Sequence, residues 1–247
     1  MDKIIKVTLG LFIALLVVFV AFVGYTIFVD AAFRSSLNST YSYSCSITTD
    51  SILTNVTFFI PVPENPSGSS LVVTRIGARE ISGLPNDWDV TLYGTGKSTL
   101  LQITTPKISP PAGNGAPVST TIRFSVDVRS PNVIDTINPL ADSAMFRPVQ
   151  QTKEVTCPQQ PTTSAGSPHC TEYLTAIYAS YSADPNASLT IHSEITGRNE
   201  WKIFEPRYNE YRNTLDVLMF GDNHGWATTR GWLESGIGST DMPVIAP

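Results

Sequence analysis

Histidine and cysteine, which build many catalytic and metal centres, are scarce in this 247-residue sequence, with three of each. There is no GxSxG, HExxH or SxxK motif, and no histidine has the partner pattern of a nucleophile or metal site. The cysteine spacings match no zinc pattern. We therefore expect a protein that is not an enzyme and has no cofactor and no metal site.

Charge is also scarce, at 15% of the residues, and the 23-residue segment 7–29 (VTLGLFIALLVVFVAFVGYTIFV) has none. At about 1.5 Å of rise per residue, a helix of this length crosses the roughly 30 Å hydrocarbon core of a bilayer. The segment is apolar on every face and has no polar stripe to meet water, which disfavours the alternative of a buried helix of a soluble protein. We expect a transmembrane helix from Val7 to Val29, with the lipid bilayer as its partner.

Charges beside this segment predict its orientation. Lys3 and Lys6 precede it, whereas Asp30 opens the far side and Arg34 follows. By the positive-inside rule, residues 1–6 are cytoplasmic and the C-terminal domain is extracellular. We expect a single-pass protein of the cell membrane.

Two alternatives concern the same segment. Val29 and Ala31 would suit the cleavage site of a signal peptide, but the apolar region of a signal peptide has only about 7 to 15 residues, so we favour a retained anchor. Gly10 and Ala14 form a small-xxx-small pair that would let a second helix approach closely. A homo-oligomer therefore stays open.

The remaining chain is acidic and rich in strand formers. Without Asp2, Lys3 and Lys6, the 16 basic and 21 acidic residues become 14 and 20, a net charge of −6. This charge disfavours nucleic acid as a partner. The domain is heavy in Ser, Thr, Val, Ile and aromatic residues, which favours strands over helices.

Short segments with period-2 alternation, separated by turns rich in Gly, Pro, Asn and Asp, predict an antiparallel β-sandwich. We expect a stalk over 30–40, the sandwich over 41–235 and a flexible tail over 236–247. A seam at 131–148 would divide the sandwich if there are two domains. In the second strand, Ile52, Thr54, Val56, Phe58 and Ile60 are expected on one face. The expected strands are 41–48, 52–60, 71–79, 88–93, 99–105, 118–130, 171–181, 188–196, 201–205, 214–220 and 226–233, with a helical turn near 140–145.

The cysteines all fall in the predicted extracellular part, where disulfides persist. Cys157 and Cys170 bracket a loop rich in Pro, Ser, Thr and Gly, and a bridge closing this loop is the natural pairing. Cys45 is then left over, either as a buried thiol or as an intermolecular link.

Sequons for N-glycosylation occur at Asn38, Asn55 and Asn186. Their number is that expected by chance, so they permit glycans without indicating them.

The last predicted strand carries the best candidate for a binding surface. Trp226, Thr228, Arg230 and Trp232 fall on one strand face. Two indoles with an arginine between them can be a core face or an exposed platform for sugar rings or aromatic side chains. Tryptophan and arginine are enriched at binding hot spots, and a guanidinium is almost never buried unpaired.

The anchor followed by LTNVTFFIPVP, and the distal GRNEWKIF and NEYRNTL segments, resemble uncharacterised membrane-anchored surface proteins of archaea, particularly methanogens. This resemblance implies no activity. We expect a non-enzymatic surface protein for adhesion, envelope architecture or binding of a protein or glycan partner. An accessory or sensory subunit of a membrane complex and an extracytoplasmic hydrolase are the alternatives.

Overall fold

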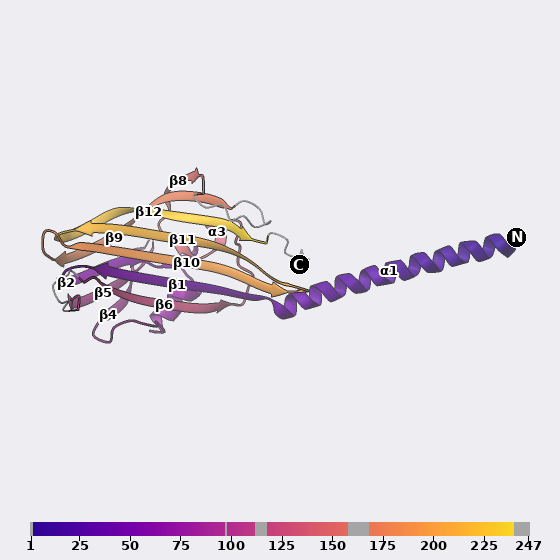
Figure 1. Cartoon of the computed structure of the whole chain (residues 1–247), viewed down its shortest axis with the longest axis horizontal. Coiled ribbons are helices and arrows are strands. Elements are labelled where there is room, and N and C mark those ends of the chain that lie inside the picture. The colour runs from indigo at the N-terminus through magenta and orange to yellow at the C-terminus, as the bar shows by residue number, and fades with distance from the viewer. Residues whose placement is uncertain (1, 97, 112–117, 158–167, 240–247) are drawn as a thin grey trace.

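The computed structural model describes residues 2–96, 98–111, 118–157 and 168–239. One long helix, α1 (Asp2–Ser36), projects alone from a β domain (Figure 1). The stretch Ile5–Ser36 is long and apolar enough to span a membrane, and none of its apolar window is buried against the rest of the chain. The prediction of a long apolar N-terminal helix is confirmed.

The predicted stalk over 30–40 is wrong. Helix α1 continues to Ser36, and strand β1 begins at Asn38. The extra helical turns are stabilised by an ion pair one turn apart, in which Arg34 Nε lies 2.9 Å from Asp30 Oδ2. Phe33 is fully buried at the base of the domain. The helix therefore enters the sheet without a linker.

The described residues of the β domain form twelve strands and two short helices. Their bounds are β1 (Asn38–Thr49), β2 (Leu53–Pro61), β3 (Pro63–Glu64), α2 (Leu71–Gly77), β4 (Asp89–Gly94), β5 (Thr99–Ile108), β6 (Thr120–Ser130), α3 (Pro139–Asp142), β7 (Met145–Phe146), β8 (Gln150–Val155), β9 (His169–Ser182), β10 (Ser188–Lys202), β11 (Pro206–Phe220) and β12 (Asn223–Gly238).

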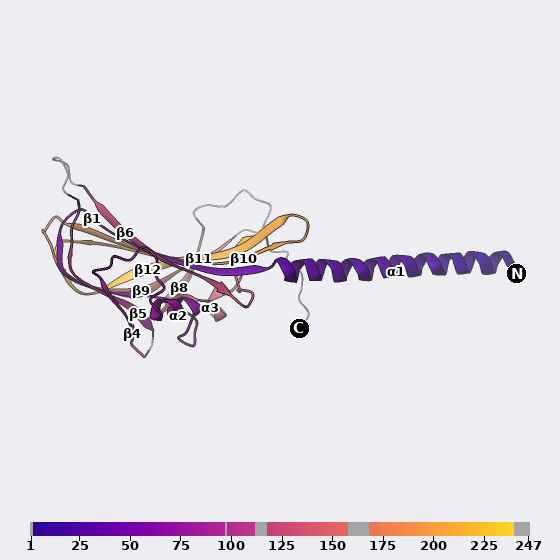
Figure 2. The ribbon, with the colours of Figure 1, turned by 90° about the horizontal axis from the view of Figure 1, so that it is seen from below.

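Ten of these strands form one antiparallel sheet in the order β4-β5-β2-β9-β12-β11-β10-β1-β6, with β8 beside β9. The mainly β, antiparallel class is confirmed, although the core is closed by the curl of this one sheet rather than by a second sheet of similar size (Figure 2). Helices α2 and α3 and the β3-β7 pair lie on one side of the sheet, which we call the inner face. The opposite side is the outer face.

The segment 131–148, predicted as a seam, lies inside the curl and belongs to the core. Ile134, Met145 and Phe146 are buried. This irregular segment is joined to the sheet by two buried amides. Asn199 Oδ1 accepts a hydrogen bond from Ile134 N at 2.9 Å, and Asn213 Oδ1 accepts one from Phe146 N at 3.1 Å. These backbone N–H groups are buried away from water and are not paired with a strand. The asparagine side chains supply the hydrogen-bond partners that they would otherwise lack.

The predicted strand 71–79 is a helix, α2. Ser70 caps its N-terminus by accepting a hydrogen bond from Val73 N at 3.1 Å. Val72 and Ile76 are both buried and lie four residues apart, which is a helical spacing. Packing of this pair against the core overrides the β-branched composition of the segment.

Strand β2 places Leu53, rather than Ile52 and Thr54, on the inner face together with Val56, Phe58 and Ile60. Ile52 is exposed. The register against β9 shifts between Thr54 and Thr57, and Asn55 has a φ of 54°. This irregularity moves the alternation by one residue and explains the wrong assignment at the start of the strand.

Strands β10 and β11 are longer than predicted, and residues 203–205 form the turn between them rather than a strand. Their inner face carries Gly197, Asn199, Asn209 and Asn213 where the alternation would need apolar residues. At Gly197, an added Cβ would lie 2.2 Å from Tyr211 Cε1, so only glycine lets the ring cross the strand.

We expect Asn213→Leu to lower the free energy of unfolding by about 2–4 kcal/mol. The change leaves the Phe146 N–H, the Tyr173 hydroxyl and the Trp232 carbonyl without their buried partner. Thr214→Val, one residue along on the outer face, should change it by less than about 0.5 kcal/mol. Urea unfolding followed by tryptophan fluorescence measures both. Equal stability of the two variants would show that the amide does not hold segment 131–148.

Candidate functional site

The four candidate residues of strand β12 all point to the outer face. Trp226 is 60% exposed, Thr228 and Arg230 are exposed, and Trp232 is half-buried. Leu233 and Thr229 are buried on the inner face instead. The interpretation of this strand face as core is therefore wrong, and its exposure agrees with the platform interpretation.

The four residues do not form one continuous platform. Trp226 and Trp232 are six residues apart, which is about 20 Å along a strand. Between them, Arg230 Nη1 lies 3.0 Å from Glu172 Oε1. The Trp232 indole N–H donates to Glu234 Oε1 at 3.1 Å. Trp232 therefore lies among charged side chains, and Trp226 lies apart from them.

Trp226 ends a row of aromatic rings that crosses the sheet. In the strand register, Trp226 lies opposite Tyr178, and Tyr178 lies opposite Phe59. Ring centroids are 5.5 Å apart from Trp226 to Tyr178, 5.4 Å from Tyr178 to Phe59 and 5.3 Å from Phe59 to Tyr93, all edge to face. We call Trp226, Tyr178, Phe59 and Tyr93 the aromatic row. Edge-to-face contacts of this kind hold each ring in a fixed orientation against its neighbour. The row is therefore formed before any ligand binds.

The row lies at the end of the sheet far from α1. Strand β11 places two more exposed apolar side chains beside β12, Leu218 and Phe220, of which Phe220 is 66% exposed. The side chains around the row on the outer face are mostly neutral and polar, among them Thr91, Gln102 and Ser180. This end of the outer face therefore presents aromatic rings bordered by neutral hydrogen-bonding groups.

Charged residues gather on the same face nearer α1. His192, Glu194, Asp216, Arg212 and Glu210 form a chain of ion pairs across β10 and β11. The closest contact is from His192 Nδ1 to Asp216 Oδ1, at 2.7 Å. Glu210 is buried, whereas the other four groups are half-buried or exposed, so the ion pairs among those four contribute little to stability. Their arrangement leaves the aromatic row outside the charged region.

The hydrogen bond that His192 donates to Asp216 raises the pKa of His192 above its usual value, against a smaller opposing effect of burial. Because the folded pKa is raised, this pair stabilises the fold fully below the ordinary histidine pKa of about 6.5 and loses its effect as the pH rises through the raised pKa.

Asp216→Asn should lower the pKa of His192 and remove this pH dependence. Imidazole NMR shifts recorded against pH measure the change, with His224 as the internal reference. An unchanged His192 titration in the variant would contradict the assignment of the shift to Asp216.

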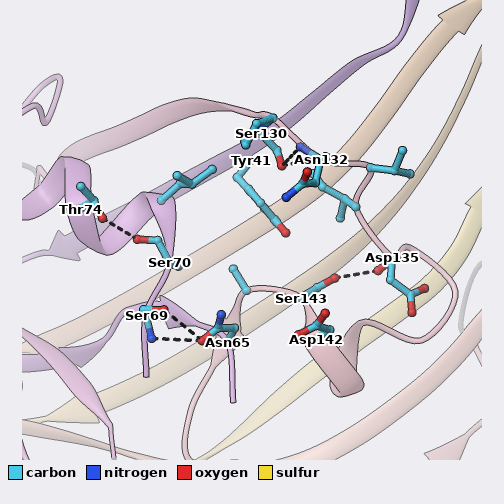
Figure 3. A pocket seen from close by; sticks show the side chains of 15 residues that line it. Tyr41, Asn65, Ser69, Ser70, Thr74, Ser130, Asn132, Asp135, Asp142 and Ser143 are labelled. Atoms are coloured by element: carbon cyan, nitrogen blue, oxygen red, sulfur yellow. Dashed lines mark hydrogen bonds between the residues drawn. The ribbon is translucent and has the colours of Figure 1, made fainter. Parts of the chain in front are cut away.

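A separate cavity of about 470 Å³ opens between α2, α3 and the start of β1 (Figure 3). Ser143 Oγ donates to Asp135 O at 2.9 Å on its wall. Burial raises the pKa of Tyr41. Among the described residues, the lining of the cavity includes hydroxyl, amide and carboxylate groups and no lysine, arginine or histidine. The labelled polar residues include Tyr41, Asn65, Asn132, Asp135 and Asp142.

Cys157 and Cys170 form the predicted disulfide, with their Cα atoms 5.4 Å apart. Residues 158–167 of the loop lie outside the described part of the chain. Cys45 is a buried free thiol, as one of the two alternatives predicted, and burial raises its pKa to about 12. A thiol in this position is a poor nucleophile.

Of the three sequons, Asn55 and Asn186 are exposed, and Asn38 is half-buried at the junction of α1 and β1. Residues 236–238 of the predicted tail extend strand β12, and 240–247 lie outside the described residues.

The sequence interpretation missed Phe59, Tyr178, Tyr93 and Phe220. Each stands on the polar side of an alternating strand, where a large aromatic residue is out of pattern. An aromatic residue on the polar side of a strand can be recognised in the sequence of that strand alone. The row cannot, because it depends on the pairing of strands that are far apart in the sequence.

Comparisons with protein-family models, with curated proteins and with solved structures find no match to this chain.

Proposed function

We propose that this chain is a non-enzymatic, single-pass membrane protein that displays its sheet domain outside the cell and binds a neutral glycan through the aromatic row. The uncovered apolar helix supports anchoring. Lys3 and Lys6 at its start support a cytoplasmic N-terminus. The disulfide supports an oxidising location for the domain.

The aromatic row is the observation that carries the binding proposal. From β12 to β4 it crosses four strand steps, and the three distances between neighbouring rings allow at most about 16 Å between the centroids of Trp226 and Tyr93. A row of this length suits several units of a polymer better than one small molecule. The apolar faces of sugar rings can stack on aromatic rings, and the neighbouring Thr, Gln and Ser side chains can bond sugar hydroxyls.

Charge favours a neutral ligand over an acidic one. The domain has a net charge of −6, obtained by leaving out Asp2, Lys3 and Lys6 from the whole chain, and repels acidic polymers. The rings are held by one another before any ligand arrives, so little side-chain entropy is lost on binding. A protein partner that buries the same rings is the competing occupant.

Trp226→Ala should weaken binding of a neutral oligosaccharide at least tenfold, or about 1.4 kcal/mol, with little change in melting temperature because the indole is exposed. Trp232→Ala is the matched control, since it removes an indole from the same strand face outside the row. The full chain in lipid nanodiscs would first be screened on an array of neutral and acidic glycans and then measured by calorimetry against the best neutral one.

Three results would overturn this ligand: no neutral glycan bound, binding of acidic glycans only, or equal loss in the two variants. Capture of a defined protein that depends on Trp226, with no glycan bound, would assign the row to a protein partner instead.

The two alternative functions stay predictions. An accessory or sensory subunit would use the same outer face toward a membrane complex. For a hydrolase, the nearest arrangement in the described part of the chain is Asp216 bonded to His192, with Ser46 opposite His192 on β1. No hydrogen bond joins Ser46 to His192 among the described residues, so the aromatic row supports binding better than this trio supports catalysis.

A further inference from the structure

The turn between β10 and β11 lies against helix α1. The ring centroids of Phe204, in this turn, and Phe28, in α1, are 6.2 Å apart. One step closer to the sheet, Trp201 packs on Phe33 with centroids 5.9 Å apart. Ser36 Oγ also donates to Lys202 O at 2.9 Å. Both ribbon views show this end of the sheet meeting the C-terminal end of α1 (Figures 1 and 2).

These contacts place the turn at the depth of the apolar segment. Phe28 lies inside the uncharged run 7–29. Tyr25 and Val29 of the helix line a groove of about 400 Å³ together with Ile203 and Phe204 of the turn. If α1 crosses a bilayer along this run, then the turn reaches the same leaflet surface, because rings in contact must lie at nearly the same level.

The side chains of the turn fit a membrane interface. Phe204 is 64% exposed although it is apolar, and Ile203 beside it is half-buried. Phenylalanine is among the apolar side chains with which peripheral segments enter the boundary between lipid headgroups and acyl chains. The acidic Glu205 follows Phe204 directly and would be costly in hydrocarbon. The composition therefore suits the interface and not the bilayer centre.

Two cations flank the turn. Lys202 ends β10, and Arg207 lies opposite Trp201 at the start of β11. Both are exposed, and within the described residues neither forms an ion pair. Long basic side chains beside an apolar contact can reach lipid phosphates. The two cations and the apolar side chains of the turn therefore both favour a lipid bilayer as the partner.

We propose that the β10–β11 turn is a second membrane contact, with Phe204 in the interface and Lys202 and Arg207 on lipid phosphates. This inference rests on the proposed anchoring by α1. Two contacts hold the sheet upright on the membrane, whereas a helix alone would let it swing. The sixteen residue-to-residue steps from Phe204 to Phe220 then place the aromatic end roughly 50 Å from the bilayer at the rise of a strand.

The test uses a fluorescent probe on single cysteines in the full chain, reconstituted into phosphatidylcholine vesicles with a quencher on the lipid acyl chains. The variants are Phe204→Cys, Phe220→Cys and Phe19→Cys. All three sites are exposed phenylalanines, at 64%, 66% and 66%. They lie at the turn, at the far end of the sheet and in the middle of α1. The native thiol of Cys45 is buried and does not compete for the label.

We expect lipid quenching at position 204 to be at least half of that at position 19, and quenching at position 220 to be absent. If position 204 behaves like position 220 while position 19 is quenched, then the turn does not touch the membrane and the anchor proposal stands. If position 19 is not quenched either, both the anchor and the second contact are wrong.

Discussion

Two buried amides, Asn199 and Asn213, determine how this domain is built. Their hydrogen bonds to Ile134 and Phe146 hold the irregular segment 131–148 inside the curl of the sheet. A polar side chain in a core is costly unless it is fully paired, so these bonds form together with the packing around them or not at all. Because this segment fills part of the inner face, the outer face is the side of the sheet on which we place a partner.

The outer face changes character along the length of the long strands. Beside α1, the β10–β11 turn carries Phe204 between Lys202 and Arg207. The middle carries the ion pairs around His192 and Asp216, and the far end carries the aromatic row and Phe220. An apolar surface that lay next to the bilayer would compete for lipid. Charged side chains between the two apolar regions keep them separate, and the far region stays open for a ligand.

Sequence reasoning predicted the parts of the fold that depend on local pattern. The apolar run 7–29 and the alternation in 118–130 and 188–196 each specify an element by themselves. It failed where tertiary contacts decide. The helix α2 depends on the burial of Val72 and Ile76, and the full length of β10 and β11 depends on inward glycine and asparagine that the alternation rule does not recognise. For the site, Trp226 was visible on its strand, but its ring partners come from β9, β2 and β4, and only the strand order brings them together.

The proposed function requires that the outer face lies outside the cell, and labelling of intact cells with a membrane-impermeant maleimide tests this location most directly. The unmodified chain should not react, because Cys157 and Cys170 are bonded and Cys45 is buried. Thr228→Cys, on the outer face beside Trp226, should be labelled in intact cells, and Asp2→Cys only after the cells are opened. Labelling of Asp2→Cys in intact cells, with Thr228→Cys protected, would contradict the orientation and with it the proposed function.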